Sequence, residues 1–249
     1  MNISGNTILI TGGGSGIGRA LAHALAAEGN RIIVAGRKAD ALEETARGHE
    51  GIATAVLDVA DAGAIPAFAA KMAAEHPALN VLINNAGIMV YEDLDAEPYD
   101  LATAEAIITT NLLGPIRLTT ALLPHLRKQA AATVMTVSSG LAFVPLAPTP
   151  TYSATKAAIH SWSDSLRYLL RGTSVEVIEL APPGLRTDLT PGQADKTQYM
   201  TLDDYTAEVM TILKAAPGAP EVLVERVKPL RFAEANGNYD AMFGMLNPA

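Results

Sequence analysis

The sequence contains no cysteine. Disulfide bonds and metal sites with thiolate ligands are therefore excluded, because both need cysteine sulfur. A chain without disulfides fits a reducing compartment, and we expect the protein to be cytoplasmic. The histidines show no ligand spacing, so we also expect no metal site. They are His23, His49, His76, His125 and His160.

Charge is also scarce, and basic charge most of all. Charged residues make up 18% of the chain, and 26 acidic against 18 basic residues give a formal net charge of −8. Such a surface repels phosphate backbones, so we expect no nucleic-acid partner. The first residues, MNISGNTILI, lack the pattern of a signal peptide. No apolar run approaches the roughly 18 residues of a membrane-spanning helix, so we expect no membrane partner.

Hydrophobic residues, by contrast, are plentiful at 49% of 249 residues, enough for one large core in a single domain, 1–249. Short aliphatic runs alternate with longer segments rich in alanine and leucine. The predicted strands are 7–11, 31–36, 52–58, 81–84, 133–138, 175–180 and 221–224. The predicted helices are 17–28, 39–47, 62–75, 104–126, 152–170 and 202–213. This alternation predicts an α/β fold: a Rossmann-like, doubly wound parallel sheet of about seven strands with helices on both faces.

Glycines cluster after the first predicted strand, in TGGGSGIG at 11–18. A chain that turns sharply from strand to helix needs glycine there, and the helix N-terminus that follows offers N–H groups to an anion. Gly12, Gly16 and Gly18 fit the pattern G-x-x-x-G-x-G. A glycine-rich turn without a ligand is the alternative, but the strand–loop–helix context favours dinucleotide binding.

Three further strand ends carry candidate contacts to such a cofactor. After the second strand an acidic residue is absent and Arg37 follows, which favours NADP over NAD, although NAD remains possible; a solvated basic pair is the alternative. Asp58 ends the third strand, where it accepts the adenine amino group or caps the next helix. The stretch NNAG, 84–87, ends the fourth strand and either meets the cofactor or forms a simple turn.

Tyr152 and Lys156 lie four residues apart on a predicted helix, so they share one face. A nearby ammonium lowers the pKa of a phenol and makes it a usable general acid/base. Ser138 and Ser139 end the fifth strand, and spacing favours Ser139 as the hydroxyl beside the phenol. Asn111 lies inside a predicted helix, where asparagine is a poor choice; it is either functional or simply on the surface.

In this order and spacing, these residues and PPGLRT at 182–187 resemble the short-chain dehydrogenase/reductase family over nearly the whole chain. The stretch 138–162 also resembles a bacterial subgroup named for teichoic-acid D-alanylation genes. The resemblance implies a catalytic tetrad of Asn111, Ser139, Tyr152 and Lys156. Tyr152 would exchange a proton with the substrate oxygen, Ser139 would position that oxygen, Lys156 would hold the nicotinamide ribose, and Asn111 would hold a water. The implied cofactor-binding residues are Gly12, Ser15, Gly16, Ile17, Gly18, Arg37, Asp58, Asn84, Ala86, Gly87, Tyr152, Lys156, Pro183, Gly184, Leu185 and Thr187.

The resemblance implies a homodimer or homotetramer and a small carbonyl or alcohol substrate. The loop and helix at 185–215 are the predicted substrate-binding segment. Apolar side chains in the predicted walls favour an apolar ketone, although half of them could pack beneath the loops, and Arg186 leaves room for a carboxylate. The predicted pocket residues are Met89, Leu141, Phe143, Arg186, Tyr199 and Met200. A cofactor-binding sensor or scaffold with little turnover is the alternative function.

Overall fold

One parallel sheet forms the centre of the computed structural model, which describes residues 1–97 and 101–248. Its strands are β1 (Thr7–Thr11), β2 (Arg31–Gly36), β3 (Ile52–Val56), β4 (Leu79–Asn84), β5 (Ala132–Val137), β6 (Val175–Leu180) and β7 (Glu221–Val222). They lie in the order β3-β2-β1-β4-β5-β6-β7, and every neighbouring pair is parallel. The prediction of a Rossmann-like parallel sheet of about seven strands is confirmed.

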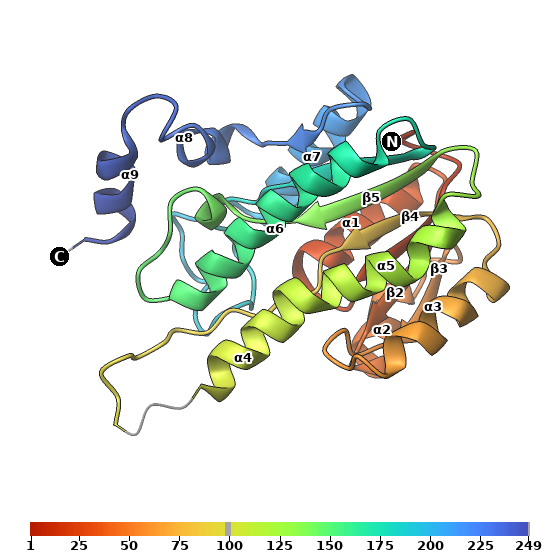
Figure 1. Ribbon diagram of the computed structural model, residues 1–249, viewed down its shortest axis with the longest axis horizontal. Helices are drawn as coiled ribbons and strands as arrows, with labels where there is room; N and C mark the ends of the chain where they lie inside the picture. The colour runs from red at the N-terminus through yellow and green to blue at the C-terminus, as the bar shows by residue number, and fades with distance from the viewer. Residues whose placement is uncertain (98–100, 249) are drawn as a thin grey trace.

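Helices cover both faces of this sheet (Figure 1). The α-helices are α1 (Gly16–Ala27), α2 (Ala39–Ala46), α3 (Ala64–Glu75), α4 (Ala102–Ile108), α5 (Gly114–Leu126), α6 (Pro150–Leu170), α7 (Leu202–Ala215), α8 (Lys228–Arg231) and α9 (Tyr239–Leu246). Short 3-10 helices occur at Gly140–Ala142 and Glu225–Val227, and a π-helix joins α4 to α5 at Thr109–Leu113. Figure 1 shows α8 and α9 reaching out beyond the sheet, in a region where the sequence predicted no helix.

The alternation of side chains along the strands divides the core in two. In β1, Ile8 and Ile10 pack in one buried cluster with side chains of α1, α2 and α7. Leu9, between them, packs in a second cluster with side chains of α3, α5 and α6. Successive side chains of a strand point to opposite faces, so a strand covered on both faces is apolar throughout. This is why the central strands could be predicted from their apolar residues, although β6 (VEVIEL) contains two glutamates.

Some element boundaries differ from the predictions. β3 ends at Val56, two residues before the predicted 52–58, and β7 keeps only two of the four residues predicted at 221–224. The predicted helix 104–126 is continuous but contains the π-helix Thr109–Leu113. Pro115 explains that irregularity, because it has no N–H and its ring clashes with the carbonyl four residues earlier, at Asn111.

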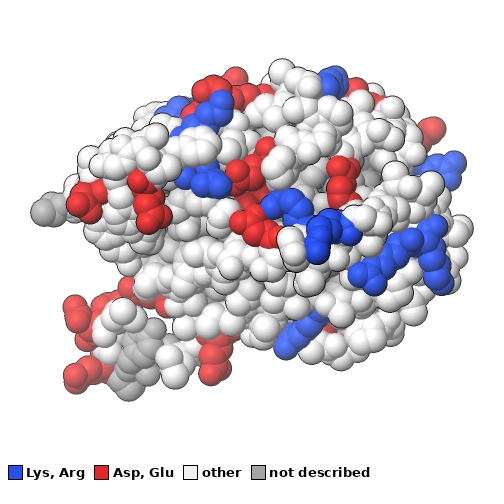
Figure 2. Space-filling view, turned by 45° about the horizontal axis from the view of Figure 1, so that its top comes forward, with Lys and Arg blue, Asp and Glu red and all other residues white. Residues whose placement is uncertain are grey.

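Within the described residues, one helical segment, Ala102–Leu126, is long and apolar enough by length and composition to cross a membrane. The expectation that no segment approaches this length is therefore corrected. The segment packs in part against the core, where Ile107, Leu118 and Leu122 are fully buried. Figure 2 shows acidic and basic side chains interspersed between wide uncharged areas on the face presented, apart from a small basic group at its right end.

Candidate active site

A cleft of about 780 Å³ lies at the carboxyl ends of the strands, where the strand order reverses between β1 and β4. Open parallel sheets bind their ligands at this switch point. The predicted site residues that line the cleft are Gly12, Ser15, Gly16, Ile17, Arg37, Asp58, Ala86, Gly87, Met89, Ser139, Tyr152, Lys156, Pro183, Leu185, Arg186 and Thr187. The predicted site residues outside its lining are Gly18, Asn84, Asn111, Leu141, Phe143, Gly184, Tyr199 and Met200.

The glycine loop is packed too closely for side chains. A Cβ on Gly18 would lie 2.3 Å from the carbonyl oxygen of Gly12, and a Cβ on Gly12 would lie 2.9 Å from Cα of Ala86. Gly12 also has φ +67°, which favours glycine. Gly16 differs, because its Cβ would meet only Thr187, at 3.8 Å. Gly12 and Gly18 therefore allow the start of α1 to pack closely against the residues after β4. Gly16 leaves space between the loop and Thr187.

The N-terminus of α1 is available to an anion. Ser15 is its N-cap residue, yet its side chain makes no capping bond to the described residues, and the first turn holds no acidic side chain. The first N–H groups of a helix have no intrahelical acceptors, and they favour negative charge in front of them. Since Ser15, Gly16 and Ile17 line the cleft, these donors fit a pyrophosphate.

The ends of β2, β3 and β4 form the rest of this half of the cleft. Arg37 and Asp58 both line it, and the Oδ1 of Asp58 also accepts a 2.9 Å bond from the Ala60 N–H. Asn84 does not reach the cleft, contrary to the prediction. It is buried, and its Nδ2 donates to the Thr119 hydroxyl at 2.9 Å.

Asn85 lines the cleft instead; it lies in the predicted stretch 84–87 but was not among the predicted cofactor-binding residues. Its Nδ2 donates to the Thr11 carbonyl at 2.9 Å, and its backbone N–H donates to the Thr11 hydroxyl at 3.0 Å. The period of two residues along β4 could have identified it. Leu82 packs in the core against α5, so Asn84, two residues on, points to the same face and Asn85 to the other.

Tyr152 and Lys156 lie on α6 and both line the cleft, as their spacing predicts. The Nζ of Lys156 donates to the Val137 carbonyl at 2.8 Å, and it lies 5.5 Å from the centroid of the Tyr152 ring. The Ser139 side chain lies beside the Tyr152 hydroxyl and lowers its pKa. The structure thus brings a phenol, a hydroxyl and an ammonium together at one end of the cleft. Ser138 also lines the cleft, but its buried hydroxyl has no partner among the described residues.

Burial dominates the pKa values of this group. It raises the pKa of Tyr152 to about 12, and the hydrogen bond with Ser139 opposes that rise. Burial also lowers the pKa of Lys156 to about 8, against the opposing charge of Glu179. The expected depression of the phenol pKa by Lys156 is therefore corrected: removal of the phenol from water outweighs it. Tyr152 is held protonated at neutral pH.

Asn111 lies in the π-helix and is almost fully buried, so the alternative of a surface position is excluded. Its Oδ1 accepts from the Ile88 N–H at 2.9 Å, and its Nδ2 donates to the Ile88 carbonyl at 2.8 Å. A Cβ on Gly87 would lie 3.4 Å from that Oδ1 and 3.8 Å from the Nζ of Lys156. Asn111 therefore fixes the loop after β4 close to Lys156.

The segment after β6 closes the cleft and is held by its own polar contacts. Arg186 donates to the carbonyls of Tyr199, at 3.1 Å, and Thr197, at 2.7 Å. Met200 forms a β-bridge with Leu185. Gly184 is needed because a Cβ there would lie 2.9 Å from the Tyr199 ring. Tyr199 and Met200 thus pack beneath the segment, contrary to their prediction as pocket residues.

Gln193 is a further residue that the sequence did not reveal. It is buried and lines the cleft, and its Nε2 donates to the Leu185 carbonyl at 2.9 Å and to the Thr187 hydroxyl at 3.1 Å. Its position in a polar run gave no signal, since nothing in that run distinguishes a buried glutamine from a solvated one. Gln193 orients the two positions that are expected to meet a nicotinamide.

Leu141 and Phe143 lie outside the cleft lining, contrary to prediction. The Phe143 ring lies edge-on to His160, with centroids 4.9 Å apart, and the Arg231 guanidinium lies 4.7 Å from its centroid. Arg231 comes from α8, a helix that the sequence did not predict. Phe143 therefore faces the C-terminal segment rather than a substrate.

The residues present fit a dinucleotide. Free N–H donors stand at one end of the cleft, a basic side chain lies after β2, and the phenol and ammonium stand at the other end. Gly16 and Gly87 leave between them the room that side chains would fill. The arrangement combines anion binding with proton transfer.

Comparison with known proteins identifies the family of the chain. The family model of the short chain dehydrogenases matches residues 6–198. The chain is 41% identical over 251 residues to the uncharacterized oxidoreductase DltE of Bacillus subtilis strain 168, covering 99% of this chain and 98% of that protein. It is 34% identical over 187 residues to a sulfoacetaldehyde reductase of Chromohalobacter salexigens, covering 74% of each.

Solved structures share the fold at lower identity. A short chain dehydrogenase from Burkholderia cenocepacia, in complex with NADP, has a TM-score of 0.83 at 24% identity over 99% of both chains. A short chain dehydrogenase/reductase from Burkholderia phymatum, in complex with NAD, has a TM-score of 0.80 at 21% identity over 100% of this chain and 98% of that one. By family model, sequence identity and fold, the chain belongs to the short-chain dehydrogenase/reductase family of oxidoreductases, in the subgroup of DltE.

Proposed function

We propose that this oxidoreductase is an NADP(H)-dependent carbonyl reductase that transfers a hydride between the nicotinamide and a ketone or secondary alcohol. The observation that carries the proposal is that Tyr152, Ser139 and Lys156 line one cleft together with the donors for a dinucleotide, with the Nζ of Lys156 5.5 Å from the centroid of the Tyr152 ring. The direct test is consumption of NADPH with a panel of apolar and anionic ketones and aldehydes. Binding of NADPH without turnover across the panel would favour the alternative of a cofactor sensor.

Each residue has a distinct task in this reaction. The bound nicotinamide nucleotide supplies or accepts the hydride. Ser139 donates a hydrogen bond that orients the substrate oxygen, and Tyr152 gives that oxygen a proton on reduction. Lys156, held by the Val137 carbonyl, places its charge beside the cofactor ribose and the phenol. Thr187 and the backbone at Leu185 would hold the carboxamide.

Reduction is the direction that the electrostatics favours. A phenol whose pKa is raised to about 12 by burial is protonated at neutral pH, so it is ready to donate a proton to a carbonyl oxygen. Alcohol oxidation needs the phenolate instead, which this burial disfavours. We therefore expect ketone reduction to be faster than alcohol oxidation at neutral pH.

This assignment predicts opposite pH dependence for the two directions. Reduction needs the Tyr152 phenol and the Lys156 ammonium, whose pKa is lowered to about 8, so kcat for ketone reduction is expected to be level below pH 8 and to fall above it. Oxidation needs the phenolate and is expected to rise with pH. Steady-state kcat in both directions from pH 6 to 10 checks this. A reduction rate that climbs through pH 8 to 10 would contradict the proton-donor role.

The preference for NADP rests on Arg37. It follows β2 directly and lines the cleft where the adenosine ribose would lie, and no acidic side chain occupies the end of that strand. A guanidinium binds a 2′-phosphate by charge-assisted hydrogen bonds. One fold neighbour is a complex with NADP and another a complex with NAD, so the fold accepts either cofactor and local residues decide.

Arg37→Asp is therefore expected to raise the Kd of NADPH by about 10- to 100-fold, since a hydrogen bond to a charged group contributes about 1.5–3 kcal/mol. The Kd of NADH is expected to change far less. Fluorescence titration of both cofactors gives the two Kd values. Lys38→Ala, which alters the adjacent basic residue, serves as the control. An unchanged ratio of the two Kd values in Arg37→Asp would show that Arg37 does not read the 2′-phosphate.

An apolar substrate fits the remaining part of the cleft. Ile88, Met89, Val90 and Leu189 line the cleft. The Arg186 guanidinium is already committed to two loop carbonyls, which leaves it poorly placed to bind a carboxylate. One relative is named as a sulfoacetaldehyde reductase, so the panel should compare apolar ketones with a small anionic aldehyde.

A homodimer or homotetramer is the proposed assembly. The outer face of α6 supports it, because Tyr168 and Leu169 are 64% and 71% exposed. Contiguous exposed apolar surface marks regions that associate, and these two side chains would contribute to such a surface.

A further inference from the structure

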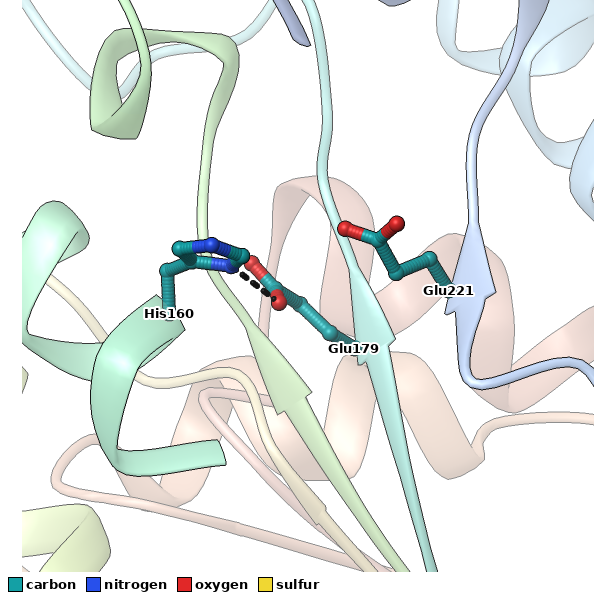
Figure 3. A group of neighbouring side chains, drawn as sticks. All are labelled: His160, Glu179 and Glu221. Atoms are coloured by element: carbon teal, nitrogen blue, oxygen red, sulfur yellow. Dashed lines mark hydrogen bonds and ion pairs between the residues drawn. The ribbon is translucent and has the colours of Figure 1, made fainter. Parts of the chain in front are cut away.

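A second cluster of ionisable side chains lies outside the cleft lining (Figure 3). It consists of His160 on α6, Glu179 on β6 and Glu221 on β7, and one ligand-type atom from each lies within 4.8 Å of the others. The Nδ1 of His160 is 2.7 Å from the Oε2 of Glu179. Glu179 and Glu221 are in register on neighbouring parallel strands.

Glu179 is the unusual member of this cluster. Its side chain is fully buried, and its Oε1 has no hydrogen-bond partner among the described residues. A buried carboxylate is strongly destabilised unless cations or hydrogen bonds compensate for the lost water. Its neighbours must therefore supply positive charge.

Two cations on α6 do so. Lys156 and His160 are four residues apart, directly after Tyr152 in the same spacing, so the three side chains form a row on one helix face. Lys156 is held at the end of β5, the strand beside β6. Glu179 raises the pKa of both side chains, and for Lys156 it opposes the larger effect of burial.

Charge balance argues against a metal ion in the cluster, although its side chains are of the ligand type. Glu221 is already paired with Arg231, whose Nε and Nη2 donate to its two oxygens at 2.7 and 3.2 Å. The hydrogen bond to Glu179 favours the charged form of His160, and the neighbouring Asp164 favours it further, while Arg231 opposes it. A metal ion would have to displace the Arg231 guanidinium and a proton from His160.

We propose that Glu179 is a positioning residue for the reaction: its buried carboxylate stabilises the ammonium form of Lys156 from outside the cleft, and the partly exposed His160 is its partner toward solvent. The inference rests on the proposed function for the role of Lys156. Among the described residues, the charged side chains that act on this pair are Lys156 and Asp164 on α6, Glu221 on β7 and Arg231 on α8. Glu179 lies outside the cleft lining, so it would act only through Lys156.

Glu179→Gln tests this, because it removes the charge and keeps the shape. The alkaline limit of ketone reduction is expected to move to lower pH by about one unit, the smaller end of the effect of a nearby opposite charge. At pH 6, where Lys156 is charged in both proteins, kcat is expected to stay within about twofold. Coincident pH profiles would overturn the proposal.

Glu221→Gln is the matched control. It makes the same substitution at the in-register position of the next strand, and its profile is expected to follow that of the unaltered protein. Glu179→Asp keeps the charge and moves it back by one methylene, so a smaller shift in the same direction is expected. This variant also serves if Glu179→Gln does not fold.

A readout without turnover separates this proposal from the proposed function. NMR titration of the Lys156 side chain, identified by its loss in Lys156→Arg, reports its pKa directly. A lower Lys156 pKa in Glu179→Gln supports the inference even if no substrate is found, and an unchanged one rejects it even if the protein is an active reductase. Calorimetric binding of Zn²⁺ that disappears in His160→Gln would instead identify a metal site and overturn the charge-pair assignment.

Discussion

Tyr152→Phe is expected to bind NADPH as tightly as the unaltered protein and to reduce ketones about 10²- to 10⁴-fold more slowly, the usual contribution of a general acid. The substitution removes one hydroxyl from a ring that is only 7% exposed, so the packing around the ring is retained. The substitution removes the proton donor. All other groups that are expected to hold the cofactor remain. The measurements are kcat at pH 7 and the Kd of NADPH by fluorescence titration.

Tyr168→Phe is the matched control, since it removes a phenol from the same helix at a position that is 64% exposed. Its kcat is expected to be unchanged. If Tyr152→Phe kept a kcat within tenfold of the unaltered protein, proton donation by Tyr152 would be rejected. If it lost NADPH binding as well, the phenol would have to be assigned to cofactor binding rather than to proton transfer.

Gly18→Ala is expected to abolish cofactor binding through packing alone. The added Cβ would lie 2.3 Å from the Gly12 carbonyl oxygen and 2.6 Å from the Nδ2 of Asn85. One of these contacts is with backbone, so α1 must move away from the end of β4 and take its N–H donors with it. Overpacking of this kind costs about 1–3 kcal/mol. The Kd of NADPH is expected to rise by at least about 100-fold, since hydrogen bonds to a charged group contribute about 1.5–3 kcal/mol each.

The control is Gly244→Ala, in α9, where no described atom lies within 4 Å of the added Cβ. Alanine there is expected to be neutral or stabilising by up to about 1 kcal/mol, because glycine is a weak helix former. Thermal unfolding separates lost stability from lost binding. A folded Gly18→Ala that bound NADPH normally would show that α1 does not carry the anion site.

The fold was predictable because its signals are local. The central strands β1, β4 and β5 are buried on both faces and rich in apolar residues, and Gly29 and Gly172, both with positive φ, mark helix ends. The two-residue β7 was predicted too long because only Glu221 and Val222 pair with β6. The C-terminal helices were missed because α8 has four residues and the side chains of α9 are not buried.

The site was predictable to the extent that spacing along one element determines it. Tyr152 and Lys156 share a helix, and Gly12 and Gly18 share a turn, so chain geometry brings each pair together. The substrate residues were not predictable in this way. Phe143 packs against Arg231, 88 positions away in the numbering, and Tyr199 packs beneath Gly184, so only tertiary structure shows that both lie outside the cleft.

Electrostatics was the least predictable property. From the sequence, Lys156 was expected to make Tyr152 more acidic, but the pKa of a phenol depends on how much water reaches it. Tyr152 is only 7% exposed, and the sequence does not show which segments cover its ring. The interaction of His160 with Glu179 joins a helix to a strand, and spacing within one element does not reveal it.

The π-helix at Thr109–Leu113 means that the number of residues in this stretch, and not only their identity, determines where Asn111 lies. Each residue added to or deleted from a helix rotates everything on one side of it by about 100° relative to the other. Deletion of one residue here would replace the wide π-helical turn by regular α-helix and shift Asn111 from its place beside Ile88. The extra residue of this stretch is therefore what lets a side chain inside a long helix hold the loop after β4.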